Sequence, residues 1–194
     1  MKDMQSPLRR DHRVCPWWLA WTFDNPLRRF FHEPGKIVGP FLREGMTVAD
    51  IGCGMGYFTV AMAKMVGEKG TVIAADIQEK MLEVTRWRAE RAGVAGRVRT
   101  LRASEDDVGI REPVDFVLVF WMVHEVKDIP RFFGQVSAAL KEGGKVLYAE
   151  PLFHVTERRF REILGYAQGA GLRVSDAPPI RFSRAAVLSK WGLS

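Results

Sequence analysis

The sequence has little cysteine and no long apolar run. Its 194 residues include two cysteines, Cys15 and Cys53, which cannot form a disulfide framework and do not make a CxxC pair. Such sparse cysteine fits a reducing, cytoplasmic compartment. No hydrophobic stretch approaches the roughly 18 to 20 residues that a membrane span requires. The basic, aromatic start of the chain is broken by Pro16 and lacks a small-residue cleavage site, so we expect no signal peptide.

Histidine is scarce as well, whereas positive charge is in excess. The four histidines do not pair at ligand spacing, so we predict no metal site. Twenty-nine basic residues outnumber twenty-three acidic ones, which gives a formal net charge of +6. Such an excess suits nucleic acid, an anionic surface or an acidic substrate. Six arginines between positions 86 and 102 straddle a predicted helix and the next strand, so we favour a solvated basic face over nucleic-acid contact.

What the chain does have is a regular alternation of strand and helix patterns. A length of 194 residues favours a single domain, with an aromatic and basic segment over 1–36 and a core over 37–194. Short β-branched runs predict strands at Thr47–Asp50, Thr71–Asp76, Arg97–Arg102, Val114–Phe120 and Lys145–Glu150. Helical patterns between them predict helices at Tyr57–Val66, Ile77–Ala92 and Pro130–Leu140. This rhythm indicates an α/β fold, a doubly wound sheet built from right-handed βαβ units.

Two details of the helices follow from spacing and end signals. In the first helix, Phe58, Ala61, Met62 and Met65 have the spacing of one buried face. The glycine pair at 143–144 suits the exit of the helix that begins at Pro130.

The C-terminal part changes character. Residues 156–169 predict a helix with one apolar face, formed by Phe160, Ile163, Leu164 and Ala167. The runs GLRVSDAPPIRF and SRAAVLSK then predict two strands with too little chain between them for a helical crossover. We therefore expect this last pair to be antiparallel in an otherwise parallel sheet.

The most informative stretch is DIGCGMG, from Asp50 to Gly56. A strand end, three glycines at alternate positions and a helix start follow one another directly. Parallel sheets bind ligands beyond the carboxyl ends of their strands, and glycines there let the main chain approach a ligand closely. The first turn of the next helix also offers free N–H groups. The stretch is therefore predicted to be a cofactor cradle.

Two acids decide between cofactor classes. A dinucleotide fold would show GxGxxG, whereas here the spacing is GxGxG, with Asp50 two residues before the first glycine. An acid at that place repels a pyrophosphate and suits a cationic amine. Asp76 ends the next strand, 20 residues after Gly56, where its carboxylate can accept hydrogen bonds from a ribose diol. S-adenosylmethionine combines ribose, adenine and an amino-acid group without a phosphate.

The stretches VADIGCGMGYFTVAMA, VIAADIQEKML and VDFVLVFWMVHEV together resemble class I S-adenosylmethionine-dependent methyltransferases. The predicted antiparallel end of the sheet is similar to that family's seven-stranded, Rossmann-like sheet, so the resemblance covers about residues 37–190. It implies a small-molecule methyltransferase, similar to those of ubiquinone and menaquinone biosynthesis, that uses S-adenosylmethionine and releases S-adenosylhomocysteine.

The resemblance also implies roles for single residues. Asp50 would lie near the ammonium group of the cofactor, Asp76 would hold the ribose, and Ile77 would pack on the adenine. Many relatives carry an Asp-Ala pair where this chain has Ala103 and Ser104, so the neighbouring Glu105 becomes the candidate for the adenine amino group. The full cofactor-binding set is Asp50, Gly52, Cys53, Gly54, Gly56, Asp76, Ile77, Gln78, Ala103, Ser104, Glu105, Phe120, Trp121 and Met122.

Candidates for chemistry beyond the cofactor are few. His124 and Glu125 follow the fourth strand, where a capping or orienting role competes with work as a general base, and Glu150 after the fifth strand is similar. Cys53 is expected to be a small packing residue. Methyl transfer from a sulfonium needs a base only when the acceptor must lose a proton, so a missing catalytic dyad does not argue against an enzyme.

The aromatic start of the chain admits three interpretations. Its rings can be core over the sheet edge, a cover for the active site, or an anchor at a membrane surface, with five arginines nearby to support the last. The rings are Trp17, Trp18, Trp21, Phe23, Phe30 and Phe31. Their aromatic character favours an apolar or aromatic small-molecule acceptor.

Two alternatives stay open at this point. One is a nicotinamide-dependent oxidoreductase, against which the glycine spacing, Asp50 and the terminal strand pair argue. The other is a non-catalytic partner subunit that keeps the methyltransferase fold, against which the intact glycine motif and Asp76 argue. The acceptor, the atom methylated and the oligomeric state are not predicted.

Overall fold

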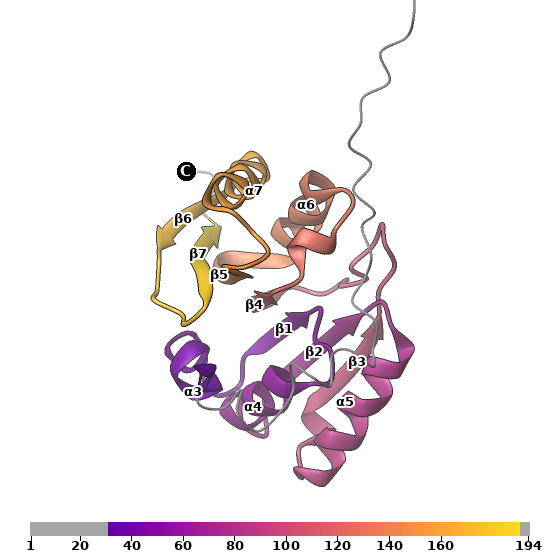
Figure 1. Ribbon diagram of the computed structural model, residues 1–194. Coiled ribbons are helices and arrows are strands. Elements are labelled where there is room, and N and C mark those ends of the chain that lie inside the picture. Colours follow the sequence, from indigo (N-terminus) through magenta and orange to yellow (C-terminus); the bar gives the residue numbers. More distant parts are fainter. Residues whose placement is uncertain (1–30, 191–194) are drawn as a thin grey trace, which may run out of the picture.

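The computed structural model describes residues 31–190, which form a seven-stranded mixed sheet with helices on both faces (Figure 1). The strand order is β3-β2-β1-β4-β5-β7-β6. The strands are β1 Thr47–Ile51, β2 Thr71–Asp76, β3 Val98–Arg102, β4 Val114–Phe120, β5 Leu140–Pro151, β6 Leu172–Asp176 and β7 Ser183–Lys190. β7 runs antiparallel to both β5 and β6, and the other pairs are parallel. The predicted fold class is confirmed.

The helices divide into two layers (Figure 1). On one face lie α3 (Pro34–Ile37), α4 (Tyr57–Met65) and α5 (Glu79–Arg91), and on the other lie α6 (Ile129–Ala139) and α7 (Glu157–Gly169). Short 3-10 turns occur at η1 (Gly39–Phe41), η2 (Ala95–Arg97) and η3 (Val123–Glu125). The predicted helix ends differ from these bounds by two residues at most.

The central strands are buried on both faces, which explains their unbroken apolar sequences. In β4, Phe116, Leu118 and Phe120 face the cluster that includes α4, while Val117 and Val119 face the cluster under α6 and α7. Successive side chains of a strand point to opposite faces, so one strand supplies both cores.

Two details of the sequence interpretation are wrong. Phe58 and Met62 are buried as predicted, but Ala61 and Met65 are only half-buried, and the buried face is completed by Thr59, Ala63 and Val66. The pair Gly143–Gly144 does not end a helix, because α6 ends at Ala139 and both glycines lie inside β5. There the pairing with β4 is irregular and Gly143 has a φ of +73°, so the glycines accommodate a bulge.

Within residues 31–36, His32 packs on the core. His32 is 3% exposed, and its Nε2 lies 2.8 Å from the carbonyl oxygen of Arg181. The proposed separation of 1–36 from 37–194 stays a prediction. The aromatic rings at positions 17–30, Cys15 and the segment assessed as a signal peptide lie outside the described residues. Within residues 31–190, none of the helices has the length and hydrophobicity needed to cross a membrane.

One buried polar contact joins β1 to α4. The Thr59 hydroxyl donates to Oδ2 of Asp50 over 2.6 Å, and both residues are almost fully buried. A carboxylate taken out of water needs such donors, because an unsatisfied buried charge is costly. The contact therefore holds the end of β1 against the helix that follows the glycine turn.

We expect Thr59→Val to lower the free energy of unfolding by about 1.5–3 kcal/mol, because it keeps the side-chain shape and removes a hydrogen bond to a charged group. Urea titration followed by circular dichroism measures the change. Thr59→Ser keeps the hydroxyl and should lose less. An equal loss in the two variants would contradict the prediction, because losing the methyl group would then cost as much as losing the hydrogen bond.

Candidate functional site

A cavity of about 220 Å³ opens at the carboxyl ends of the parallel strands. The last residue of β2 and the turns after β1 and β2 contribute Gly52, Gly54, Asp76, Ile77 and Gln78 to its wall. The loops after β3 and β4 contribute Ala103, Ser104, Glu105, Trp121, Met122 and Glu125. The structure thus brings eleven of the residues selected from the sequence to one cavity.

The glycine turn packs too tightly for larger residues at two positions. Gly52 has a φ of +72°, and a Cβ there would lie 2.7 Å from Cγ of Met122. Gly56 has a φ of +79°, and a Cβ there would lie 2.8 Å from Oγ1 of Thr85. These glycines let the turn lie between the loop after β4 and helix α5 while its main chain borders the cavity.

Asp76 links the glycine turn to the start of α5. Its Oδ2 accepts the Gly54 N–H over 3.0 Å, and its Oδ1 accepts the Gln78 N–H over 2.9 Å. Burial raises the pKa of Asp76, and the hydrogen bonds from Gln78, Gly54 and Ile77 oppose that rise only in part. A carboxylate has about four lone-pair sites, which is more than these three N–H groups use, so Asp76 can still accept a hydrogen bond from a ligand.

Six predicted residues do not line the cavity: Asp50, Cys53, Gly56, Phe120, His124 and Glu150. The Asp50 carboxylate turns to Thr59, and its role toward an ammonium group stays a prediction. Burial and the charges of Asp50 and Asp76 raise the pKa of the Cys53 thiol, which keeps it protonated. Cys53 is buried at 7% exposure, as a packing residue would be.

His124 forms a pair with Glu150 beside the cavity. Nδ1 of His124 lies 2.6 Å from Oε2 of Glu150, and the His124 main-chain N–H donates to Oε1 over 3.0 Å. The sequence singled out both residues, but nothing in it indicated that they meet, because 26 residues separate them.

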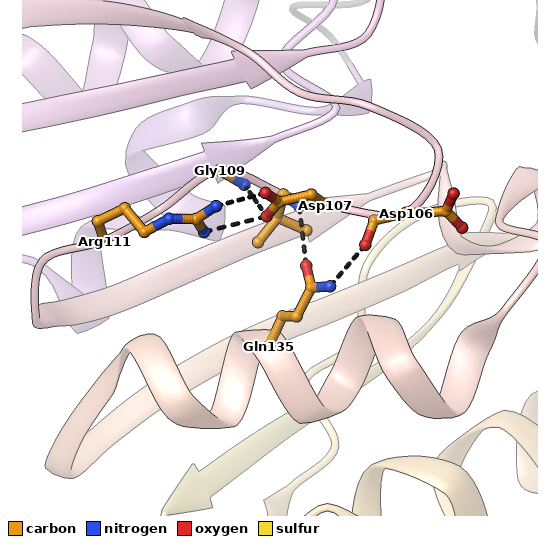
Figure 2. Close-up of polar contacts among 6 residues, drawn as sticks. Asp106, Asp107, Gly109, Arg111 and Gln135 are labelled. Atoms are coloured by element: carbon orange, nitrogen blue, oxygen red, sulfur yellow. Dashed lines mark hydrogen bonds and ion pairs between the residues drawn. The ribbon is translucent and has the colours of Figure 1, made fainter.

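Helix α6 contributes wall residues that the sequence did not signal, including Phe132 and Gln135. Figure 2 shows Gln135 reaching from the helix to the loop between β3 and β4. Its Oε1 accepts the Val108 N–H over 2.8 Å, and its Nε2 donates to the Asp106 carbonyl over 2.7 Å. An amide that satisfies two main-chain groups of one loop fixes that loop against the helix.

The same loop also contains an exposed ion pair (Figure 2). Arg111 pairs with Asp107, whose Oδ1 also accepts the Gly109 N–H over 2.8 Å. These contacts, led by Arg111, lower the pKa of Asp107 to about 2. Lys127 and Glu105 both line the cavity, and Nζ of Lys127 donates to Oε2 of Glu105 over 2.6 Å.

An exposed aromatic surface continues from the cavity along the same edge of the sheet. It consists of the exposed rings of Phe31, Phe153 and Phe182, the exposed Leu152 and the half-buried ring of Trp121. Trp121 has a φ of +61°, a left-handed conformation that is unfavourable for a bulky residue. Its indole N–H donates to the Ser183 hydroxyl over 2.9 Å, which helps to hold the ring in place. Strained residues of this kind gather at ligand sites.

We expect Gln135→Leu to speed amide exchange at Val108 about tenfold, because the amide loses its acceptor. Hydrogen exchange followed by nuclear magnetic resonance measures the rate. Arg111→Ala is the matched control, since it removes an exposed ion pair of the same loop, and such pairs contribute little. Unchanged exchange in Gln135→Leu would show that the loop does not depend on α6.

Comparisons with known proteins agree on one family. Residues 48–144 match the family described as a methyltransferase domain. A ubiquinone/menaquinone biosynthesis C-methyltransferase of Vibrio vulnificus is 31% identical over 115 residues, covering 57% of this chain and 44% of that protein. The corresponding enzyme of Haemophilus ducreyi is 28% identical over 147 residues, covering 73% and 57%. The chain thus spans about half the length of the relatives that it matches.

Solved structures agree on the fold. A SAM-dependent methyltransferase from Aquifex aeolicus has a TM-score of 0.81 at 24% identity, covering 90% of this chain and 98% of that one. A SAM-dependent O-methyltransferase from Thermotoga maritima has a TM-score of 0.66 at 20% identity, covering 84% and 66%.

Proposed function

The chain belongs to the methyltransferase domain family, and we propose that it moves a methyl group from S-adenosylmethionine to a small-molecule acceptor. The observation that carries the proposal is Asp76, a buried acid that lines the cavity and bonds to the glycine turn. Family membership favours methyl transfer over the nicotinamide-dependent alternative.

The residues at the cavity fit this cofactor. The carboxylate of Asp76 suits the two hydroxyls of a ribose, and Ile77, the next residue, suits the face of an adenine. Ala103, Ser104 and Glu105 come from the loop that Gln135 fixes, on the adenine side of the proposed site. The glycine turn borders the cavity with bare main chain, as a cofactor that approaches closely requires.

The charge of the cavity supports a cationic ligand. Six acids line it, namely Asp76, Glu105, Asp106, Asp107, Glu125 and Asp128, against Lys127 and Arg131. The whole chain, by contrast, carries a formal charge of +6. A pyrophosphate would be repelled here, whereas a sulfonium and an ammonium group would be attracted.

The aromatic surface supports an apolar or aromatic acceptor. Phe153 is 60% exposed and Phe182 is 44% exposed, and exposed apolar patches mark binding sites. Trp121 belongs both to this surface and to the cavity wall, so an acceptor stacked there would lie next to the cofactor site. S-adenosylhomocysteine would be the product that remains.

In the proposed mechanism, the main contribution of the protein is to orient the acceptor relative to the methyl group. S-adenosylmethionine, when bound, supplies a methyl group on an excellent sulfur leaving group. The protein has to align the acceptor in line with that bond, and orientation of this kind contributes roughly 7–11 kcal/mol to barrier lowering. Gly52 leaves room for Met122, so the loops after β1 and β4 lie close together, and Trp121 in the cavity wall would orient the acceptor.

We expect Asp76→Ala to weaken binding of S-adenosylhomocysteine about tenfold to a hundredfold, because hydrogen bonds to a charged group contribute about 1.5–3 kcal/mol. Isothermal titration calorimetry measures the affinity. Asp115→Asn is the matched control, since Asp115 lies at the opposite end of β4 and pairs with Lys141. Full affinity in Asp76→Ala would remove Asp76 from the site, and an unreactive wild type that does not bind the ligand would favour the non-catalytic alternative.

Binding of S-adenosylhomocysteine should also weaken as the pH falls. Burial raises the pKa of Asp76, so its carboxylate becomes protonated at a higher pH than that of an ordinary aspartate and then accepts fewer hydrogen bonds. Calorimetry across an acidic pH series tests this, with Asp76→Asn as the variant that should lose the dependence. The sign for folding is opposite, because a raised folded-state pKa means that proton uptake by Asp76 favours the folded protein.

A further inference from the structure

The Glu150 carboxylate does more than cap the turn at His124, because it also contacts the imidazole ring. Glu150 is 0% exposed, and both of its oxygens contact the same residue, through the ring nitrogen and the main-chain N–H of His124. A buried carboxylate that meets one residue twice fixes both the position and the rotation of the imidazole ring.

This arrangement also selects the tautomer. When Nδ1–H donates to a carboxylate, Nε2 carries the lone pair that can accept a proton. Nε2 lies 3.9 Å from Oε1 of Glu125, and Glu125 lines the cavity. The side chain of His124 is 22% exposed, so a ligand can reach it.

The surroundings make the ring more basic. Burial alone lowers the pKa of His124, but the hydrogen bond and charge of Glu150, together with the charge of Glu125, raise it above its usual value. The His154 ring packs on it with centroids 5.5 Å apart. Nearby Tyr148 does not compete with His124 as a proton acceptor, because burial and the Glu150 charge raise the pKa of its phenol and keep it neutral.

A chain of rings connects His124 to the aromatic surface. The ring of His154 contacts that of Phe153 at 4.9 Å, and Phe153 contacts Trp121 at 5.7 Å. An aromatic acceptor stacked among these rings would therefore have its substituents close to both His124 and the cavity.

From this juxtaposition we propose that His124 is the general base of the reaction, that Glu150 positions it, and that the acceptor carries a weakly acidic hydroxyl on an aromatic ring. The inference rests on the proposed function. In the step, the acceptor O–H bond breaks and its proton moves to Nε2, an O–CH₃ bond forms, and the CH₃–S bond breaks with its electrons left on sulfur. His124 then releases the proton to water.

The test uses two phenols that differ in acidity, 4-methylphenol and 4-nitrophenol, with S-adenosylmethionine carrying a radiolabelled methyl group. For 4-methylphenol, which needs a base near neutral pH, we expect His124→Gln to lower kcat/KM at least a hundredfold. For 4-nitrophenol, which ionises in this range without help, the loss should be much smaller. Glu157→Gln, an exposed change at the start of α7, is the control and should behave as wild type.

The pH profile separates a positioning role for Glu150 from a structural one. In wild type, the rate should fall as the pH drops through the raised pKa of His124, because only the neutral ring accepts a proton. Glu150→Gln removes the neighbouring charge, so this acidic limb should move to lower pH. Nitrogen-15 chemical shifts of wild type give a readout that survives a misfolded variant, and they should show Nδ1 protonated and Nε2 not.

The outcomes distinguish this inference from the proposed function. A wild type that does not bind S-adenosylhomocysteine contradicts the proposed function. Binding with no transfer to either phenol, equal losses for the two phenols in His124→Gln, or the opposite tautomer overturns the dyad and leaves the cofactor assignment intact.

Discussion

The site depends on one hydrogen-bonded acid between two strand ends. Asp76 joins the Gly54 N–H, beyond β1, to the Gln78 N–H, ahead of α5. The glycine turn has to fold back over the end of β1, because the cavity would otherwise lose the main-chain wall beside that strand. The turn can do so because Gly52 and Gly56 leave room for Met122 and Thr85. The Asp76 carboxylate thus links the glycine motif of the sequence, the conformation of its turn and the wall of the cavity.

The order of strands and helices was predictable because its signals are local. Apolar runs, helical spacing and glycines fall where the elements lie, and the terminal strand pair followed from the short connection between its strands. The glycine pair at 143–144 led to a wrong prediction of a helix end, because glycine occurs in β-bulges as well as at the ends of helices. The helix face around Phe58 was only partly predicted, because a helix under two neighbours buries a broader stripe than one row of residues.

The cavity residues at the ends of the strands were predictable from the sequence, whereas those on helix α6 were not. Residues next to the glycine motif and after β2 to β4 carry sequence signals, and eleven of them line one cavity. Gln135 had no such signal, because its function depends on where α6 lies relative to a loop 27 residues earlier. The meeting of His124 with Glu150 likewise depends on the pairing of β4 with β5. Contacts between separate elements are fixed by tertiary packing, which local patterns do not encode.

The acidic lining has a consequence for the order of events in turnover. In the proposed reaction the cofactor enters as a sulfonium and is left as an uncharged thioether, so one positive charge disappears from a cavity whose wall carries six carboxylates and two basic side chains. Coulomb attraction to those carboxylates then weakens at the moment the methyl group leaves. The lining would therefore bind S-adenosylmethionine more tightly than S-adenosylhomocysteine. Methyl transfer itself would then promote release of the product and its replacement by new cofactor.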